Sequence, residues 1–134
     1  MTDTVDLLAG VPLLSGLDRK QLERLAKDFS ARTLPAGSVV VREGDDHSIG
    51  FFVVAEGHGV VTVGGKKVGE IGPGSYFGEV ALITDRMRTA TVTATTDLHC
   101  LVMTIWDFRA FVRGDTEVAW KLLEHLSTLL RDKV

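Results

Sequence analysis

The chain has 134 residues and a formal net charge of -3 at pH 7. This length suits one domain, because two domains would each be too small to bury a good core. The acidic balance gives no overall attraction for nucleic acid or anionic membranes, and the single cysteine, Cys100, excludes an intrachain disulfide framework and cysteine-rich metal sites. We therefore expect a single domain, residues 1–134, that binds neither nucleic acid nor membranes directly.

The N-terminal residues carry no basic leader, and no apolar run approaches the roughly 18 residues of a membrane span. A cytoplasmic protein is the corresponding expectation. Cys100 lies in an apolar run, residues 98–103, where a small buried residue is the ordinary reading.

Residues 1–34 are predicted to form an N-terminal helical part. Short apolar groups in residues 1–17 are broken by glycine and proline, which favours a helical turn that packs on another element. Asp18 and Gln21 have the spacing of a capping box, in which each side chain satisfies a backbone N–H at the helix start. Apolar residues then follow at helical spacing, so the pattern predicts an amphipathic helix over residues 18–29.

Residues 35–104 change to the short apolar runs and glycine turns typical of strands. The predicted strands are residues 39–41, 51–55, 60–63, 68–71, 89–95 and 98–103. Gly64 and Gly65 form a two-residue hairpin turn of the kind that needs positive φ angles. We expect about seven or eight short strands in all, these six among them, which predicts a mainly β fold, an antiparallel jelly-roll-like barrel with helices on both sides.

Residues 105–134 return to helical spacing and are predicted to form two C-terminal helices. Thr104 and Asp107 open the first helix, Gly114 ends it, and Asp115 can cap the second, from about residue 116 to 131. Three roles for the second helix stay open. They are a lid through Trp120, Leu123, Leu126 or Leu130, docking on the barrel, and a homodimer seam through Ala119, Leu122, Leu126 and Leu129.

The chemistry concentrates in residues 72–91, GPGSYFGEVALITDRMRTAT. Gly78 permits close backbone approach to a ligand, and residues 80–83 can form one helical turn whose free N–H groups, at Val80 and Ala81, would bind an anion. Arg88 can add a two-pronged, charge-assisted contact to the same phosphate oxygens.

Glu79 supplies the complementary chemistry, because an ionised carboxylate accepts hydrogen bonds and cannot donate them. It therefore requires donor partners, which the hydroxyl groups of a ligand can supply. In a 3′,5′-cyclic nucleotide the phosphate occupies two ribose oxygens and leaves the 2′-hydroxyl free. One acceptor carboxylate beside one phosphate clamp matches the sugar-phosphate of such a ligand.

The run YFGEVALITDRMRTATV, residues 76–92, resembles the phosphate-binding cassette of the cyclic-nucleotide-binding domain family. Its pattern is F-G-E-hydrophobic-A-L, a short spacer and R-T-A-T. Other pieces agree over nearly the whole chain: VPLLSGL at 11–17, PAG at 35–37, EGD at 43–45 and GPG at 72–74. The resemblance, to sensor domains of the catabolite-activator and protein kinase A regulatory-subunit type, implies a β-roll with helices at both ends and a cassette at residues 72–91.

The resemblance also implies roles for particular residues. Glu79 would hold the 2′-hydroxyl, and Arg88 would hold the phosphate together with the Ala81 amide and the Gly78 backbone. Thr89 and Ala90 would lie beside phosphate and base. The implied ligand site comprises Val61, Ile71, Phe77, Gly78, Glu79, Val80, Ala81, Arg88, Thr89 and Ala90, of which Val61 and Ile71 would line the apolar floor.

One residue departs from the family pattern. Met87 stands where proline commonly precedes the arginine, so the loop lacks the fixed φ that proline would give it. We expect the affinity to be lowered because this loop must become ordered when the ligand binds. Arg86 is interpreted as an exposed loop charge.

The function that follows is a non-enzymatic sensor that needs no cofactor beyond its ligand, cAMP or cGMP. We expect cAMP to be favoured, although Thr89 does not decide the base, and movement of the C-terminal helices to carry the signal to a second copy or an effector protein. The four histidines show no metal-ligand spacing, which weighs against a cupin-type metalloenzyme. Two alternatives stay open: the sensor fragment of a catabolite-activator-type transcription regulator, and a degenerate, ligand-free interaction domain.

Overall fold

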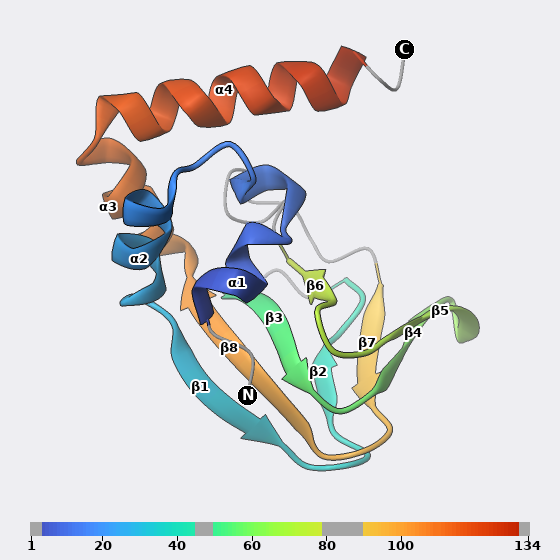
Figure 1. Ribbon diagram of the computed structural model, residues 1–134. Coiled ribbons are helices and arrows are strands. Elements are labelled where there is room, and N and C mark those ends of the chain that lie inside the picture. Colours follow the sequence, from blue (N-terminus) through green and yellow to red (C-terminus); the bar gives the residue numbers. More distant parts are fainter. Residues whose placement is uncertain (1–3, 45–49, 79–89, 132–134) are drawn as a thin grey trace.

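The computed structural model describes residues 4–44, 50–78 and 90–131 (Figure 1). Helices at both ends of the chain lie together at one end of a β-roll, which confirms the predicted fold class. The helices are α1 (Thr4–Ala9), the 3-10 turn η1 (Pro12–Leu14), α2 (Arg19–Ala26), α3 (Ile105–Arg113) and α4 (Thr116–Arg131). The strands are β1 (Ser30–Leu34), β2 (Val39–Val41), β3 (Gly50–Glu56), β4 (Gly59–Val63), β5 (Lys66–Ile71), β6 (Tyr76–Phe77), β7 (Thr91–Ala94) and β8 (Leu98–Thr104).

The strands form two four-stranded sheets in which every pair is antiparallel. The first has the order β1-β8-β3-β6 and the second the order β2-β7-β4-β5. Strand β5 lies at an edge of the second sheet, where Thr62 opposes Lys67 and Val61 opposes Gly69. Val68 is therefore the extra residue of a bulge, and the bulge together with two lysines protects this edge from pairing with another chain.

Two apolar clusters follow from the alternation of side chains along β3. Phe51 and Val53 face the helices, where they pack with residues of α1, η1, α2 and α4. Phe52 and Val54 belong to the second cluster, which fills the space between the two sheets and includes Cys100. The first cluster thus holds the helices on the first sheet, and the second holds the sheets together.

Local signals account for several element boundaries. The capping box at α2 is confirmed, since Gln21 N–H donates to Asp18 Oδ1 at 2.9 Å and Asp18 N–H to Gln21 Oε1 at 3.0 Å. Thr104 caps α3 at 3.1 Å, and Asp115 accepts from the first N–H groups of α4. Gly64 and Gly65 adopt the expected positive φ angles, +59° and +81°.

The helix predicted for residues 18–29 is too long at its C-terminal end. Helix α2 stops at Ala26, because the next turn tightens into bonds from Asp28 N–H to Leu25 O and from Phe29 N–H to Ala26 O. Phe29 instead meets Phe51 edge-on, with ring centroids 6.0 Å apart. Strands β1 and β6 are also additions to the prediction.

None of the helices in the described part of the chain is long and apolar enough to cross a membrane.

Candidate functional site

The two polar residues at the centre of the expected site, Glu79 and Arg88, lie outside the described residues. So do Val80, Ala81 and Thr89, together with Arg86 and Met87. The roles expected of these residues therefore stay predictions. The structure does describe both ends of the predicted cassette and its apolar floor.

The described residues on either side of segment 79–89 belong to different sheets. Phe77 ends β6 of the first sheet and is followed by Gly78, whereas Ala90 directly precedes β7 of the second. Gly78 has a φ of +90°, a conformation that side-chain-bearing residues rarely adopt, so the turn out of β6 requires glycine. The two ends are thus fixed by different sheets, and residues 79–89 connect them.

Phe77 is anchored by an aromatic stack. Its ring lies parallel to that of Phe52, its partner across the β3–β6 pair, with centroids 4.9 Å apart and planes 10° from parallel. Phe52 was not among the predicted site residues, although it lies in a strand that the sequence predicts. Successive side chains of a strand point to opposite faces, so Phe52 lies on the face of β3 opposite the helix-facing Phe51. This alternation along the predicted strand is the signal that could have indicated Phe52.

The predicted floor residues lie together. Ile71 on β5 is 8% exposed, and Val61 on β4 is half-buried. Both belong to the cluster between the sheets, as does Phe77, and Val92 of β7 joins them two residues after Ala90. Three apolar members of the expected site, Val61, Ile71 and Phe77, therefore share one cluster.

Gly59 makes this floor possible. It opposes Ile71 in the β4–β5 pair, and a Cβ at residue 59 would lie 2.7 Å from Thr93 O and 3.1 Å from Ile71 Cδ1. The missing side chain lets β4 approach β7 closely while Ile71 packs against it.

Helix α4 uses its inner face to dock on the N-terminal helices. Val118 and Leu122 are buried and Leu126 packs against the first apolar cluster. Part of the predicted stripe therefore serves for docking, but its main neighbours are the N-terminal helical segments and α3 rather than the barrel. Leu122, only 6% exposed, is not available for the expected dimer seam.

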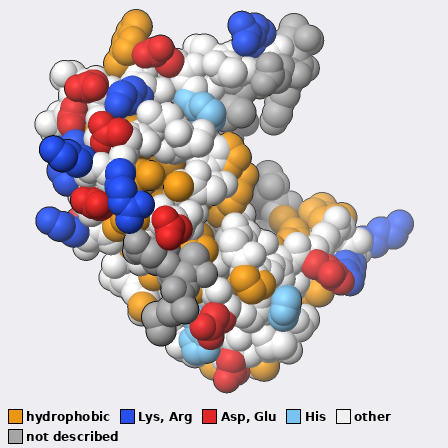
Figure 2. Space-filling model, in the orientation of Figure 1, with side chains coloured by type: hydrophobic (Ala, Val, Ile, Leu, Met, Phe, Trp, Pro, Cys, Tyr) orange, Lys and Arg blue, Asp and Glu red, His pale blue; other side chains and the backbone are white. Residues whose placement is uncertain are grey.

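The outer face of α4 carries exposed apolar side chains. Trp120 is 64% exposed, Leu123 56% and Leu130 68%. In Figure 2 the surface is hollowed between α4 and the β4–β5 hairpin, and hydrophobic side chains appear on its walls. These exposed residues differ from the inner residues that dock, and the lid and dimer roles stay predictions.

Polar contacts tie α3 and α4 to α2. Arg24 and Asp115 form an ion pair at 2.7 Å, and this hydrogen bond is the main reason that the pKa of Asp115 is lowered. Lys121 Nζ donates to Gln21 Oε1 at 3.0 Å and lies 3.7 Å from Asp18. The pKa of Asp18 is lowered chiefly by the backbone hydrogen bond from Gln21.

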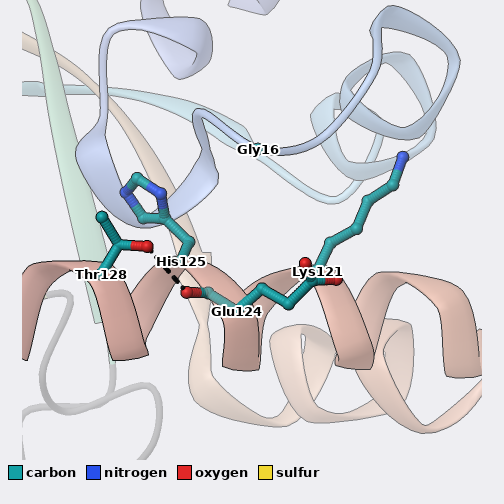
Figure 3. A pocket seen from close by; sticks show the side chains of 5 residues that line it. All are labelled: Gly16, Lys121, Glu124, His125 and Thr128. Carbon is teal, nitrogen blue, oxygen red and sulfur yellow. Dashed lines mark hydrogen bonds between the residues drawn. The ribbon is translucent and has the colours of Figure 1, made fainter.

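A pocket of about 220 Å³ lies beside these contacts, between α4 and the segment before α2 (Figure 3). Its lining residues are Gly16, Lys121, Glu124, His125 and Thr128. His125 points toward the N-terminal segment, where its Nε2 lies 3.3 Å from Ser15 Oγ, while the Lys121 side chain extends in a different direction, toward Asp18 and Gln21. Opposite charges line this pocket, so it lacks the single-sign character of a phosphate site.

Two other kinds of reactive site concern metal ligands and the single cysteine. No group of three or more histidine, cysteine or acidic side chains in that part of the chain could hold a metal ion. Cys100 is buried, and burial raises the pKa of its thiol to about 11, so it is no nucleophile at neutral pH.

Comparison with known proteins identifies the fold and the family. A family model described as the cyclic nucleotide-binding domain matches residues 31–115, which is more than half of the chain. The chain belongs to the cyclic nucleotide-binding domain family. The matched residues contain both sheets and the whole predicted cassette of this domain.

Relatives of this cyclic nucleotide-binding domain occur in larger proteins. The chain is 39% identical to a cyclic nucleotide-gated potassium channel of Mesorhizobium japonicum over 84% of its own length and 31% of the channel. It is 42% identical to the cAMP-dependent protein kinase regulatory subunit of Schizosaccharomyces pombe over 69% of its length and 22% of the subunit. It therefore spans less than a third of either relative.

A solved structure matches this domain along almost its full length. The N-terminal domain of a transcriptional regulator from Streptomyces coelicolor A3(2) superposes with a TM-score of 0.88 at 30% identity. The match covers 96% of this chain and 94% of that one. The predicted family and β-roll fold are both confirmed.

Proposed function

We propose that this domain is a non-enzymatic sensor that binds a 3′,5′-cyclic mononucleotide, with cAMP preferred over cGMP. The observation that carries the proposal is the run F-G-E through R-T-A at residues 77–90, whose flanking strands β6 and β7 belong to two sheets that share an apolar cluster. Membership of the family supports the ligand class.

In the proposed complex the cyclic phosphate meets Arg88 and the N–H groups at residues 80 and 81. Glu79 accepts a hydrogen bond from the ribose 2′-hydroxyl. The apolar cluster containing Val61 and Ile71 supplies the floor, and Ala90 lies where the loop rejoins β7. Each contact matches one chemical feature of the ligand, so a linear 5′-monophosphate should bind less well.

The preference for cAMP rests on the relatives rather than on any described contact. The fission yeast relative is named as a cAMP-dependent kinase subunit, and Thr89 by itself does not select a base. The non-enzymatic assignment rests on the family's sensor role, since hydrolysis of a phosphodiester would require an activated water or a metal pair.

The signal is proposed to leave through α3 and α4. These helices are held to α2 by a few polar contacts and by Val118 and Leu122, while Trp120, Leu123 and Leu130 stay exposed. A change in the loop that repositions α4 would present or withdraw this outer face. A second copy and a separate effector protein are both suitable partners.

Parallel calorimetric titrations with cAMP and cGMP test the proposal, with adenosine 5′-monophosphate as the control. We expect saturable binding of one nucleotide per chain, tighter for cAMP than for cGMP and weakest for the monophosphate. Absence of binding to both cyclic nucleotides at millimolar concentration would instead support a ligand-free interaction domain. Tighter binding of cGMP would overturn the base preference alone.

A further inference from the structure

Three segments meet at the end of the second sheet where the chain returns from the predicted cassette. Glu43 lies two residues after β2, Gly64 is the first residue of the β4–β5 turn, and Thr91 is the first residue of β7. The Glu43 N–H donates to Thr91 Oγ1 at 2.9 Å, and the Gly64 N–H donates to Glu43 Oε1 at 2.9 Å. We call these three residues the Glu43 junction.

The strand order explains why one residue can reach both partners. β7 lies between β2 and β4, with Val92 opposite both Val41 and Val61, and Thr91 opposite Thr62. Glu43 continues the chain beyond β2 and extends its side chain over the end of β7 to the β4–β5 turn. The backbone of Glu43 therefore holds β7, and its carboxylate holds the hairpin.

The Gly64 N–H is a backbone donor that the hairpin turn leaves available. With positive φ at both turn residues, the two-residue turn matches the twist of β4 and β5 and exposes the N–H at its first residue. The hydrogen bond from this N–H to Glu43 Oε1 restricts the movement of the hairpin that carries Val61 and Ile71. The junction consequently connects the floor of the site to the strand that follows the cassette.

We infer that Glu43 is a positioning residue for the cyclic-nucleotide site. Thr91 comes directly after Ala90 and three residues after Arg88. Fixing Thr91 therefore limits the positions open to Arg88, the proposed phosphate ligand. The inference rests on the proposed function. Neither Glu43 nor Thr91 needs to touch the ligand, because both act by setting the distance between Arg88 and the apolar residues Val61 and Ile71.

The chain offers conservative variants that separate this role from a general loss of stability. Glu43→Gln keeps an oxygen acceptor for the Gly64 N–H, whereas Glu43→Ala removes it. Thr91→Ser keeps the hydroxyl that accepts from the Glu43 N–H, whereas Thr91→Val removes it at similar size. The hydrogen bonds are exposed, so each loss should be modest and should leave the fold intact.

The experiment measures cAMP affinity and dissociation rate for the wild type and these four variants. Glu43→Ala and Thr91→Val should each weaken binding roughly three- to ten-fold, mainly through faster dissociation, as expected for one lost hydrogen bond. Glu43→Gln and Thr91→Ser should stay within about two-fold of the wild type. Equal losses in Glu43→Gln and Glu43→Ala, or unchanged affinity in Glu43→Ala, would overturn the inference.

Amide hydrogen exchange of the ligand-free protein provides a readout that does not depend on binding. The N–H groups of residues 43 and 64 should both exchange faster in Glu43→Ala and in Thr91→Val, because each bond supports the other. Faster exchange at only the directly altered bond would show that the junction does not couple the segments, and would overturn the inference.

Comparing nucleotide binding by the wild type and by Glu43→Ala separates failure of the inference from failure of the proposed function. If the wild type binds cAMP and Glu43→Ala binds equally well, only the positioning role is lost. If the wild type binds neither cAMP nor cGMP, the proposed function fails, and the positioning role of Glu43 fails with it.

Discussion

Arg88 is expected to contribute most of the binding free energy of the proposed phosphate contact. Replacing it by alanine would leave the cyclic phosphate without its charged partner. By analogy with buried charge pairs, Arg88→Ala should cost roughly 2–5 kcal/mol of binding free energy, or about thirty-fold to several-thousand-fold in affinity. Calorimetry with cAMP measures the loss, with Arg86→Ala as the matched control that should change affinity little. Unchanged binding by Arg88→Ala would remove this arginine from the site.

Gly59 and Gly69 belong to the same hairpin and differ sharply in the space around them. A Cβ at Gly59 would meet backbone at 2.7 Å, whereas one at Gly69 would meet nothing within 4 Å. Gly59→Ala should therefore destabilise the fold by about 1–3 kcal/mol, and Gly69→Ala should be near neutral. Urea unfolding of the two variants provides the comparison, and equal stabilities would contradict the packing described for the floor.

At the scale of elements, the polar contacts that join α3 and α4 to α2 involve ionised carboxylates. The pKa of Asp115 is lowered from its ordinary value of 3.8, first by the hydrogen bond from Arg24. A lowered folded-state pKa means that the contribution to stability is present above the ordinary pKa and is lost as the pH falls through the lowered one. Acid should consequently loosen these helices only below about pH 4.

Arg24→Met tests this contribution. Arg24 Cζ lies 5.7 Å from the centroid of the Phe111 ring of α3, and methionine keeps an apolar side chain at that position. The variant should lose its helix contacts at a higher pH than the wild type, because the pKa of Asp115 moves back toward its ordinary value. The fluorescence of Trp106 and Trp120, one on each helix, can follow the transition. The same acid midpoint in both proteins would show that the Arg24–Asp115 pair does not control the attachment.

Neighbouring leucines on α4 separate its inner and outer faces. Leu122 is buried and Leu123 is more than half exposed. Leu122→Ala should cost about 2–5 kcal/mol of unfolding free energy, whereas Leu123→Ala should change it by less than about 0.5 kcal/mol. Chemical unfolding at low protein concentration measures both. A larger cost at Leu123 would indicate that the outer face is covered in solution, and sedimentation would identify a dimer.

At the scale of the whole molecule, the sequence predicts best what local chemistry determines. The Asp18–Gln21 capping box, the Gly64–Gly65 turn and the Thr104 cap each depend on residues a few positions apart, and all three are confirmed. The β-roll also follows from its periodic strands and glycine turns. The resemblance of residues 76–92 to a known cassette predicted the family correctly.

Features that depend on distant partners were harder to predict. Strand β1, SARTL, has no apolar alternation and is a strand because it pairs with β8 along its whole length. Helix α2 ends early because Phe29 packs on Phe51 of another element. The stripe on α4 was visible, but which of its leucines face inward depends on where the helix docks. At the site, Val61, Ile71 and Phe77 share one cluster, while the polar roles of Glu79 and Arg88 stay predictions.

The most direct measurement of the central claim is a four-way calorimetric comparison of wild type and Glu79→Gln with cAMP and 2′-deoxy-cAMP. The account predicts that Glu79→Gln weakens cAMP binding clearly and changes 2′-deoxy-cAMP binding much less, because only cAMP offers the hydroxyl that the carboxylate accepts from. Equal losses for the two nucleotides would contradict the account, because Glu79 would then act without the 2′-hydroxyl.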